Sequence, residues 1–149
     1  MHFLKHFFFA LVLLSACIPL HAAVDVVVET KVFHRPGSNS LVEVNMAFLA
    51  GTMVNSTDAG GLTITQVEAL TLIEQDGKIA AYAKTVVSSS PRTDSVQTDM
   101  LHQEIFDLAP GNYVVTLEIR DLNSSDTTLT RYNVPLIVPA LGSEIAISD

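Results

Sequence analysis

The stretch Leu108-Ala-Pro-Gly-Asn-Tyr113, followed by the alternating run 114–121, decides the fold. Proline presets φ at about −65° and glycine can supply the positive φ that tight turns often need, so Pro110-Gly111 predicts a turn. Tyr113 then opens a run in which Val115, Leu117 and Ile119 share its face. A tyrosine in this place is typical of a tyrosine corner, where the phenol bonds back to the backbone in an immunoglobulin-like sandwich.

Short alternating runs separated by turn residues fill the rest of the chain. We expect strands at 24–33, 41–49, 62–74, 79–87, 101–108, 113–121 and 127–138, with a short final strand at 144–148. Asp76-Gly77 predicts a two-residue type I′ hairpin, and Pro135 marks the last long strand as an edge strand. The run 62–74 is fairly apolar on both faces, which predicts a central strand. The Gly-rich stretch 55–61 and the Ser-rich stretch 88–98 are expected to be loops.

Seven or eight strands without a convincing helix predict an all-β fold. The spacing favours an immunoglobulin-like or fibronectin-III-like β-sandwich of antiparallel strands, formed by residues 23–149 as a single domain. About 127 residues suit one domain, and roughly two-thirds of its surface can be buried. The chain has one cysteine, Cys17, which lies ahead of this domain. A disulfide scaffold and thiolate metal sites are therefore excluded.

The first residues predict export. Lys5 precedes the almost entirely apolar run 7–20, and a small residue, Ala22, stands at the expected cleavage position. This pattern indicates a signal peptide at 1–22 and a periplasmic or extracellular product. The alternative is a lipoprotein signal at 1–16, because Leu14-Ser-Ala-Cys17 is similar to a bacterial lipobox. In that case Cys17 is lipidated and the protein is anchored to the envelope; only then is a membrane a partner.

The charge of the chain limits its partners. The sequence has 8 Lys and Arg against 16 Asp and Glu, a formal net charge of −8. Removal of the signal peptide takes away Lys5 and makes the product more negative. Nucleic acid and anionic lipid attract clustered Lys and Arg through counterion release. No such cluster occurs in the sequence, so we expect no nucleic-acid partner, and the negative charge promotes solubility.

Four segments carry a family resemblance. They are Thr71-Leu-Ile-Glu-Gln-Asp-Gly-Lys78, Leu108-Ala-Pro-Gly-Asn-Tyr113, Leu117-Glu-Ile-Arg-Asp-Leu-Asn-Ser124 and Ile145-Ala-Ile-Ser-Asp149. In this order they resemble the N-terminal β-sandwich of the bacterial GWxTD-domain exported proteins, over 24–149. The GWxTD string itself does not occur here, and the chain contains no Trp. The resemblance implies an exported bacterial protein of unassigned biochemical role, and it transfers no catalytic residue.

The sequence offers no convincing catalytic, cofactor-binding or metal-binding residues. His34 and His102 are far apart, and a zinc site needs three or four clustered ligands. We interpret both as exposed loop or strand-edge histidines. The serines 88–90 could form a catalytic set with Asp99 and His102, but no sequence feature supplies an oxyanion hole. A serine-rich loop is the simpler interpretation.

Calcium and glycans are the remaining ligands to weigh. Asp121, Asn123, Ser125 and Asp126 are spaced like the start of an EF-hand loop. However, Asp126 replaces the expected glycine, and Tyr132 stands where a bidentate Glu is needed. A loop whose Asx and Ser side chains satisfy local backbone groups explains the same residues. Glycan platforms need exposed aromatic rings, and Tyr82 and Tyr132 are more readily assigned to cross-strand packing.

Two functions remain. We expect a non-catalytic exported module, without enzymatic activity, that mediates protein–protein interaction or assembly in the bacterial cell envelope through an edge strand or a loop end. The alternative is a small ligand-, calcium- or glycan-binding domain, or less plausibly a hydrolytic one, with its site in the loops 55–61 and 88–98. Convergence of the Asp58, Asp94 and Asp99 carboxylates in a pocket would favour this alternative.

Overall fold

Two antiparallel β-sheets make up the fold. The computed structural model describes residues 23–35, 37–94 and 96–140, and within them it contains strands and no helix. The strands are β1 (Val26–Phe33), β2 (Ser40–Phe48), β3 (Asn55–Thr57), β4 (Thr63–Gln75), β5 (Lys78–Ser88), β6 (Met100–Leu108), β7 (Gly111–Asp121) and β8 (Thr130–Val138).

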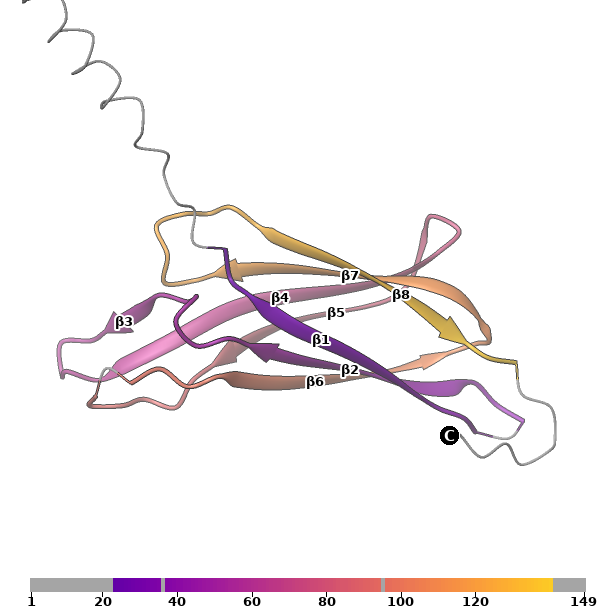
Figure 1. The fold of residues 1–149 in the computed structure, drawn as a ribbon, viewed down its shortest axis with the longest axis horizontal. Helices are drawn as coiled ribbons and strands as arrows, with labels where there is room; N and C mark the ends of the chain where they lie inside the picture. The colour runs from indigo at the N-terminus through magenta and orange to yellow at the C-terminus, as the bar shows by residue number, and fades with distance from the viewer. Residues whose placement is uncertain (1–22, 36, 95, 141–149) are drawn as a thin grey trace, which may run out of the picture.

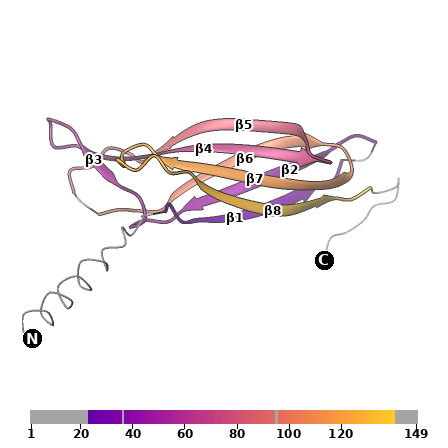
Figure 2. The same cartoon turned by 90° about the horizontal axis from the view of Figure 1, so that it is seen from above.

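The two sheets face each other as a sandwich (Figures 1 and 2). The three-stranded sheet has the order β1-β2-β6. The five-stranded sheet has the order β3-β4-β7-β8, with β5 also paired to β4. The predicted all-β sandwich of antiparallel strands is therefore confirmed. The immunoglobulin-like or fibronectin-III-like identity stays a prediction, and the expected strand 144–148 lies outside the described residues.

Local turn chemistry explains the best-predicted elements. Asp76 and Gly77 both have positive φ, 51° and 74°, as a type I′ hairpin requires. β4 is central, because it pairs with β5 on one side and β7 on the other. Pro135 lies in β8, which pairs only with β7 among the described strands and forms an edge.

The tyrosine corner is present, with one correction to its turn. The Tyr113 hydroxyl donates a hydrogen bond to the Ala109 carbonyl at 2.8 Å, and Tyr113 is buried. Gly111 is not among the residues with positive φ, so that expectation was wrong. Gly111 instead begins β7, where a Cβ would collide with the side-chain amide of Gln75. Its small size, not its backbone freedom, suits this position.

Strand β3 is a second correction. Residues 55–61 were expected to be a loop, yet Asn55–Thr57 pairs with Thr63–Thr65 of β4. Asn-Ser-Thr has no apolar alternation, so its pattern does not predict a strand. Side-chain hydrogen bonds hold the pair: Thr65 Oγ1 donates to Asn55 Oδ1 at 2.7 Å, and the Thr57 and Thr63 hydroxyls lie 3.0 Å apart.

The core lies between the inner faces of the two sheets. Alternation puts every second side chain inward, so β2 buries Val42, Val44, Met46 and Phe48. From the other sheet the buried residues of β4 and β7 face them, including Val67, Ile73, Tyr113, Val115, Leu117 and Ile119. The inner face of β7 was predicted from sequence alternation. No helix in the described part of the chain is long and apolar enough to cross a membrane.

Candidate functional site

The three loop carboxylates serve separate turns and do not converge. Asp58 Oδ1 accepts the backbone N–H groups of Gly60 and Leu62 at 2.8 and 2.9 Å. Asp99 Oδ1 accepts the N–H of Ala50 at 2.7 Å, which ties the start of β6 to the turn after β2. Asp94 lies 4.0 Å from Arg92. Each carboxylate has its own local role, so this test does not favour a site in the loops.

The EF-hand-like residues Asp121 and Asn123 also form hydrogen bonds with nearby backbone groups. Asp121 is buried; its Oδ1 accepts the N–H groups of Asn123 and Ser124, and its Oδ2 accepts that of Val54 at 2.6 Å. The Asn123 amide donates to the carbonyls of Val54 and Ile64. Across the described residues, no group of three or more His, Cys, Asp or Glu could hold a metal. Asp121 and Asn123 thus fasten the segment before β3 to the end of β7.

The serines and His102 belong to different surroundings. Ser89 Oγ accepts the N–H of Thr65, and Ser88 Oγ accepts the amide of Gln66. His102 lies on the inward side of the edge strand β6, 24% exposed, with Nε2 3.5 Å from Glu104. His102 is a strand-edge histidine, as expected, but both His102 and His34 are only partly exposed. The alternation of β6 turns His102 towards β5, where Glu104 and Thr85 form a polar contact.

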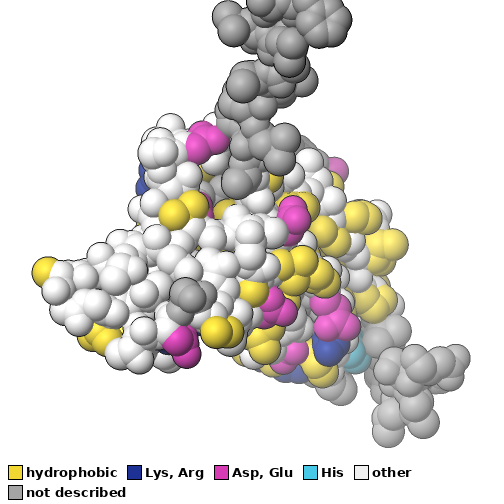
Figure 3. All heavy atoms as spheres, turned by 60° about the vertical axis from the view of Figure 1, so that its left-hand side comes forward, with side chains coloured by type: hydrophobic (Ala, Val, Ile, Leu, Met, Phe, Trp, Pro, Cys, Tyr) yellow, Lys and Arg dark blue, Asp and Glu magenta, His cyan; other side chains and the backbone are white. Residues whose placement is uncertain are grey.

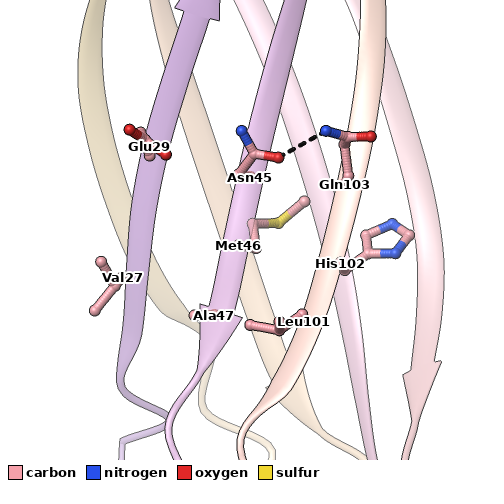
Figure 4. Close-up of a pocket in the computed structure, with 8 residues that line it drawn as sticks. All are labelled: Val27, Glu29, Asn45, Met46, Ala47, Leu101, His102 and Gln103. Atoms are coloured by element: carbon pink, nitrogen blue, oxygen red, sulfur yellow. Dashed lines mark hydrogen bonds between the residues drawn. The ribbon is translucent and has the colours of Figure 1, made fainter.

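A hollow on the outer face of the three-stranded sheet is the strongest candidate site (Figure 4). Val27 of β1, Ala47 of β2 and Leu101 of β6 are directly opposite one another in register. The small Ala47 side chain in the middle strand lies between two larger ones, and this leaves a depression. The volume is about 380 Å³. We call it the Ala47 hollow; it is lined by Val27, Glu29, Asn45, Met46, Ala47, Leu101, His102 and Gln103.

One end of the Ala47 hollow is polar. Two residues along each strand from Val27, Ala47 and Leu101, on the same face, the directly opposed residues are Glu29, Asn45 and Gln103. The Gln103 amide donates to Asn45 Oδ1 at 2.9 Å (Figure 4), and the Glu29 carboxylate lies 3.2 Å from Lys31 Nζ. The Glu29 side chain is more than half exposed, and the Lys31 side chain is about half exposed. The hollow therefore combines apolar walls, a pair of amides and one exposed carboxylate at its rim.

Further along the same face the surface stays apolar in places. Leu101 is 78% exposed and Ile105 57% exposed. Asp107 interacts with Arg35, and hydrogen bonds from Asn39 and Arg35 hold the pKa of this carboxyl below its ordinary value. On the side of the molecule seen in Figure 3, hydrophobic side chains lie at the surface among acidic ones. Exposed apolar groups on one sheet face are typical of an interaction surface.

The outer face of the five-stranded sheet is built differently. Glu68 on β4 contacts both Arg120 and Lys84, at 3.0 and 3.1 Å. Glu118 on β7 pairs with Arg131 on β8, and Thr116 bonds Asn133. These pairs run across neighbouring strands and cover Leu70 and Leu72, which are only partly exposed. The same face also exposes Tyr82 (70%) and Ile137 (69%), so ion pairs and exposed apolar side chains occur together on it.

Sequence reasoning missed the Ala47 hollow because it depends on strand order. Alternation places Val27, Ala47 and Leu101 on outward faces, but only the order β1-β2-β6 brings them together. Comparisons of the chain with protein-family models, curated proteins and solved structures found no significant match. The resemblance to GWxTD-domain proteins therefore stays a prediction.

Proposed function

We propose that the protein is a non-catalytic, exported interaction module of the bacterial cell envelope. It binds a protein partner through the Ala47 hollow on the outer face of the three-stranded sheet. The observation that carries this proposal is the row Val27–Ala47–Leu101, an open apolar depression on a face where a free-standing antiparallel sheet normally presents polar side chains. Burying Leu101 alone is worth about 1.5–3 kcal/mol.

The rim of the hollow indicates the chemistry of the partner. An apolar side chain would fill the space above Ala47, and the amides of Asn45 and Gln103 can bond a polar backbone or side chain beside it. Glu29 and the net charge of −8 favour a Lys or Arg next to that apolar residue. The partner we propose is a protein segment with an apolar anchor flanked by positive charge.

Other ligands are less well supported. The described residues that line the Ala47 hollow include no Trp, Tyr or Phe on which a sugar ring could stack. The most exposed tyrosine, Tyr82 at 70%, lies on the outer face of the other sheet. Oxygens that could attract calcium at 121–126 accept hydrogen bonds from their own loop. These features favour a protein partner over a glycan or a metal ion.

Site-specific photo-cross-linking tests the proposal. A photoreactive amino acid replaces Leu101 in one protein and Ile137 in another, and both are cross-linked in native envelope extract. Ile137 is the matched control, because it is 69% exposed on the outer side of the five-stranded sheet. We expect one protein to be captured from position 101 alone, through a segment in which an apolar residue adjoins Lys or Arg.

A second measurement completes the design. Leu101→Asp should abolish binding of the captured protein, and Ile137→Asp should leave it unchanged, with both variants folded because both positions are solvent-exposed. Equal capture from the two positions, or recovery of the protein alone, would overturn the proposal. Cross-linking to a small glycan instead of a protein would establish the ligand-binding alternative.

A further inference from the structure

Strand β1 has an unpaired edge. Among the described strands it pairs only with β2, whereas the edge strand β8 contains Pro135. β1 runs for eight residues, Val-Val-Val-Glu-Thr-Lys-Val-Phe, without proline or glycine. A long regular edge of this kind offers its free N–H and C=O groups to another strand.

The direction of these free groups follows from one hydrogen bond. The Leu49 N–H donates to the Asp25 carbonyl at 2.9 Å, and these residues are opposite each other in the register that continues through β1 and β2. In an antiparallel pair, hydrogen-bonded positions alternate with non-bonded ones. The odd-numbered residues of β1 therefore bond β2. The even-numbered residues, Val26, Val28, Thr30 and Val32, direct their backbone groups to the free edge.

The side chains on both faces of this edge are incompletely covered. Val26, Val28 and Val32 point inward but are only partly buried, in contrast to the fully buried inward residues of β2. On the outer face, Val27 is 58% and Phe33 48% exposed. A strand added beside β1 would cover apolar surface on both faces of the sheet.

The sequence of β1 complements itself when reversed. With Thr30 opposite Thr30 of a second, antiparallel copy, Val28 faces Val32 and Val27 faces Phe33. Glu29 then faces Lys31, twice by symmetry. The even-numbered residues with free backbone groups also face each other, as hydrogen bonding requires. Opposite charges and apolar residues directly opposed across antiparallel strands are stabilising.

The neighbouring registers do not share this property. A shift of one residue on each strand in one direction puts Glu29 opposite Glu29, and the opposite shift puts Lys31 opposite Lys31. Like charges directly opposed are destabilising. The charges of β1 thus favour the register centred on Thr30 over its two neighbours.

We propose that β1 pairs with β1 of a second copy of this chain across a two-fold axis at Thr30. The two three-stranded sheets then form one six-stranded sheet, and the same surface is used on both subunits. Glu29 and Lys31, 3.2 Å apart within one strand and largely exposed, gain partners on the second copy. Val27 and Glu29 of β1 also line the Ala47 hollow, whereas Leu101 lies two strands away on β6, so a change at Leu101 tests partner binding without touching the dimer contact.

Charge exchange tests the register. Sedimentation of the purified protein over a range of concentrations should show a monomer–dimer equilibrium. Glu29→Lys and Lys31→Glu should each weaken dimerisation about tenfold or more, because both symmetric ion pairs become repulsive. The double exchange Glu29→Lys with Lys31→Glu should restore the dimer. A mixture of the two single variants should form a heterodimer, since all opposed charges are then opposite.

Two controls separate this outcome from general charge effects. Asp94→Lys makes the same charge change as Glu29→Lys on an exposed loop, and it should leave the dimer intact. Leu101→Asp should also leave the dimer intact, even where it abolishes partner binding. A wild-type protein that is monomeric at every concentration, or single variants that dimerise as well as the wild type, would overturn the proposal. So would a mixture of the single variants that stays monomeric.

Discussion

The two sheets are alike on their inner faces and different on their outer ones. Both present fully buried apolar side chains to a shared core, such as Phe48 and Leu117. Outside, the five-stranded sheet places Glu68 between Arg120 and Lys84. The three-stranded sheet instead places Ala47 between Val27 and Leu101. The inner faces carry stability, and the difference between the outer faces is the basis of the partner site proposed above.

The largest expected effect tests the shared core. Phe48→Ala in the three-stranded sheet and Leu117→Ala in the five-stranded sheet should each destabilise the protein by about 3–4 kcal/mol, because each leaves a cavity at a fully buried position. Urea unfolding measures both. As the control, the exposed Leu101→Ala should change the free energy of unfolding by less than about 0.5 kcal/mol. Independent unfolding of the two sheets would contradict a single core.

A smaller effect is expected at the corner that joins the sheets. Tyr113→Phe removes the hydrogen bond to the Ala109 carbonyl and should cost about 1 kcal/mol, since the residue is buried. The melting temperature of the variant measures this loss. Tyr82→Phe is the matched control, because Tyr82 is mostly exposed and should be neutral. An unchanged melting temperature for Tyr113→Phe would show that the corner bond contributes nothing.

The smallest effect distinguishes the outer faces by their response to salt. Glu68→Gln leaves Arg120 and Lys84 without their shared carboxylate and should cost up to about 1 kcal/mol at low ionic strength. This cost should shrink in 1 M salt, where the screening length is about 3 Å. Leu101→Ala should show no such salt dependence. A salt-independent loss at Glu68 would mean that the carboxylate acts through packing instead of charge.

Local chemistry decided which parts of the fold were predictable. The hairpin at Asp76-Gly77 and the corner at Tyr113 depend on residues a few positions apart, so their sequences suffice. β3 was missed because Asn-Ser-Thr lacks apolar alternation and the strand is held by polar side chains, of which Asp121 lies far along the chain. Thr65 bonds Asn55, and Asp121 bonds the N–H of Val54 just before the strand.

The candidate site was less predictable than the fold. The EF-hand-like spacing at 121–126 drew attention to oxygens that in fact hold a turn together. The Ala47 hollow has no motif, because a single alanine in a strand signals nothing until its two neighbours are known. Strand order is a non-local property, and it is set by the packing of the whole core.

Two hydrogen bonds hold the first residues of the domain against the sandwich. The Tyr132 hydroxyl donates to the Val24 carbonyl at 3.1 Å, Val24 is buried, and the Asp25 N–H bonds Thr52 at 3.1 Å. These bonds fix the start of the described chain at the end of the sandwich where β1 and β8 begin, opposite the β4–β5 hairpin (Figure 1). Ala23 and the β4–β5 hairpin thus lie at opposite ends of the strands, so the hairpin is remote from the point where the described chain begins.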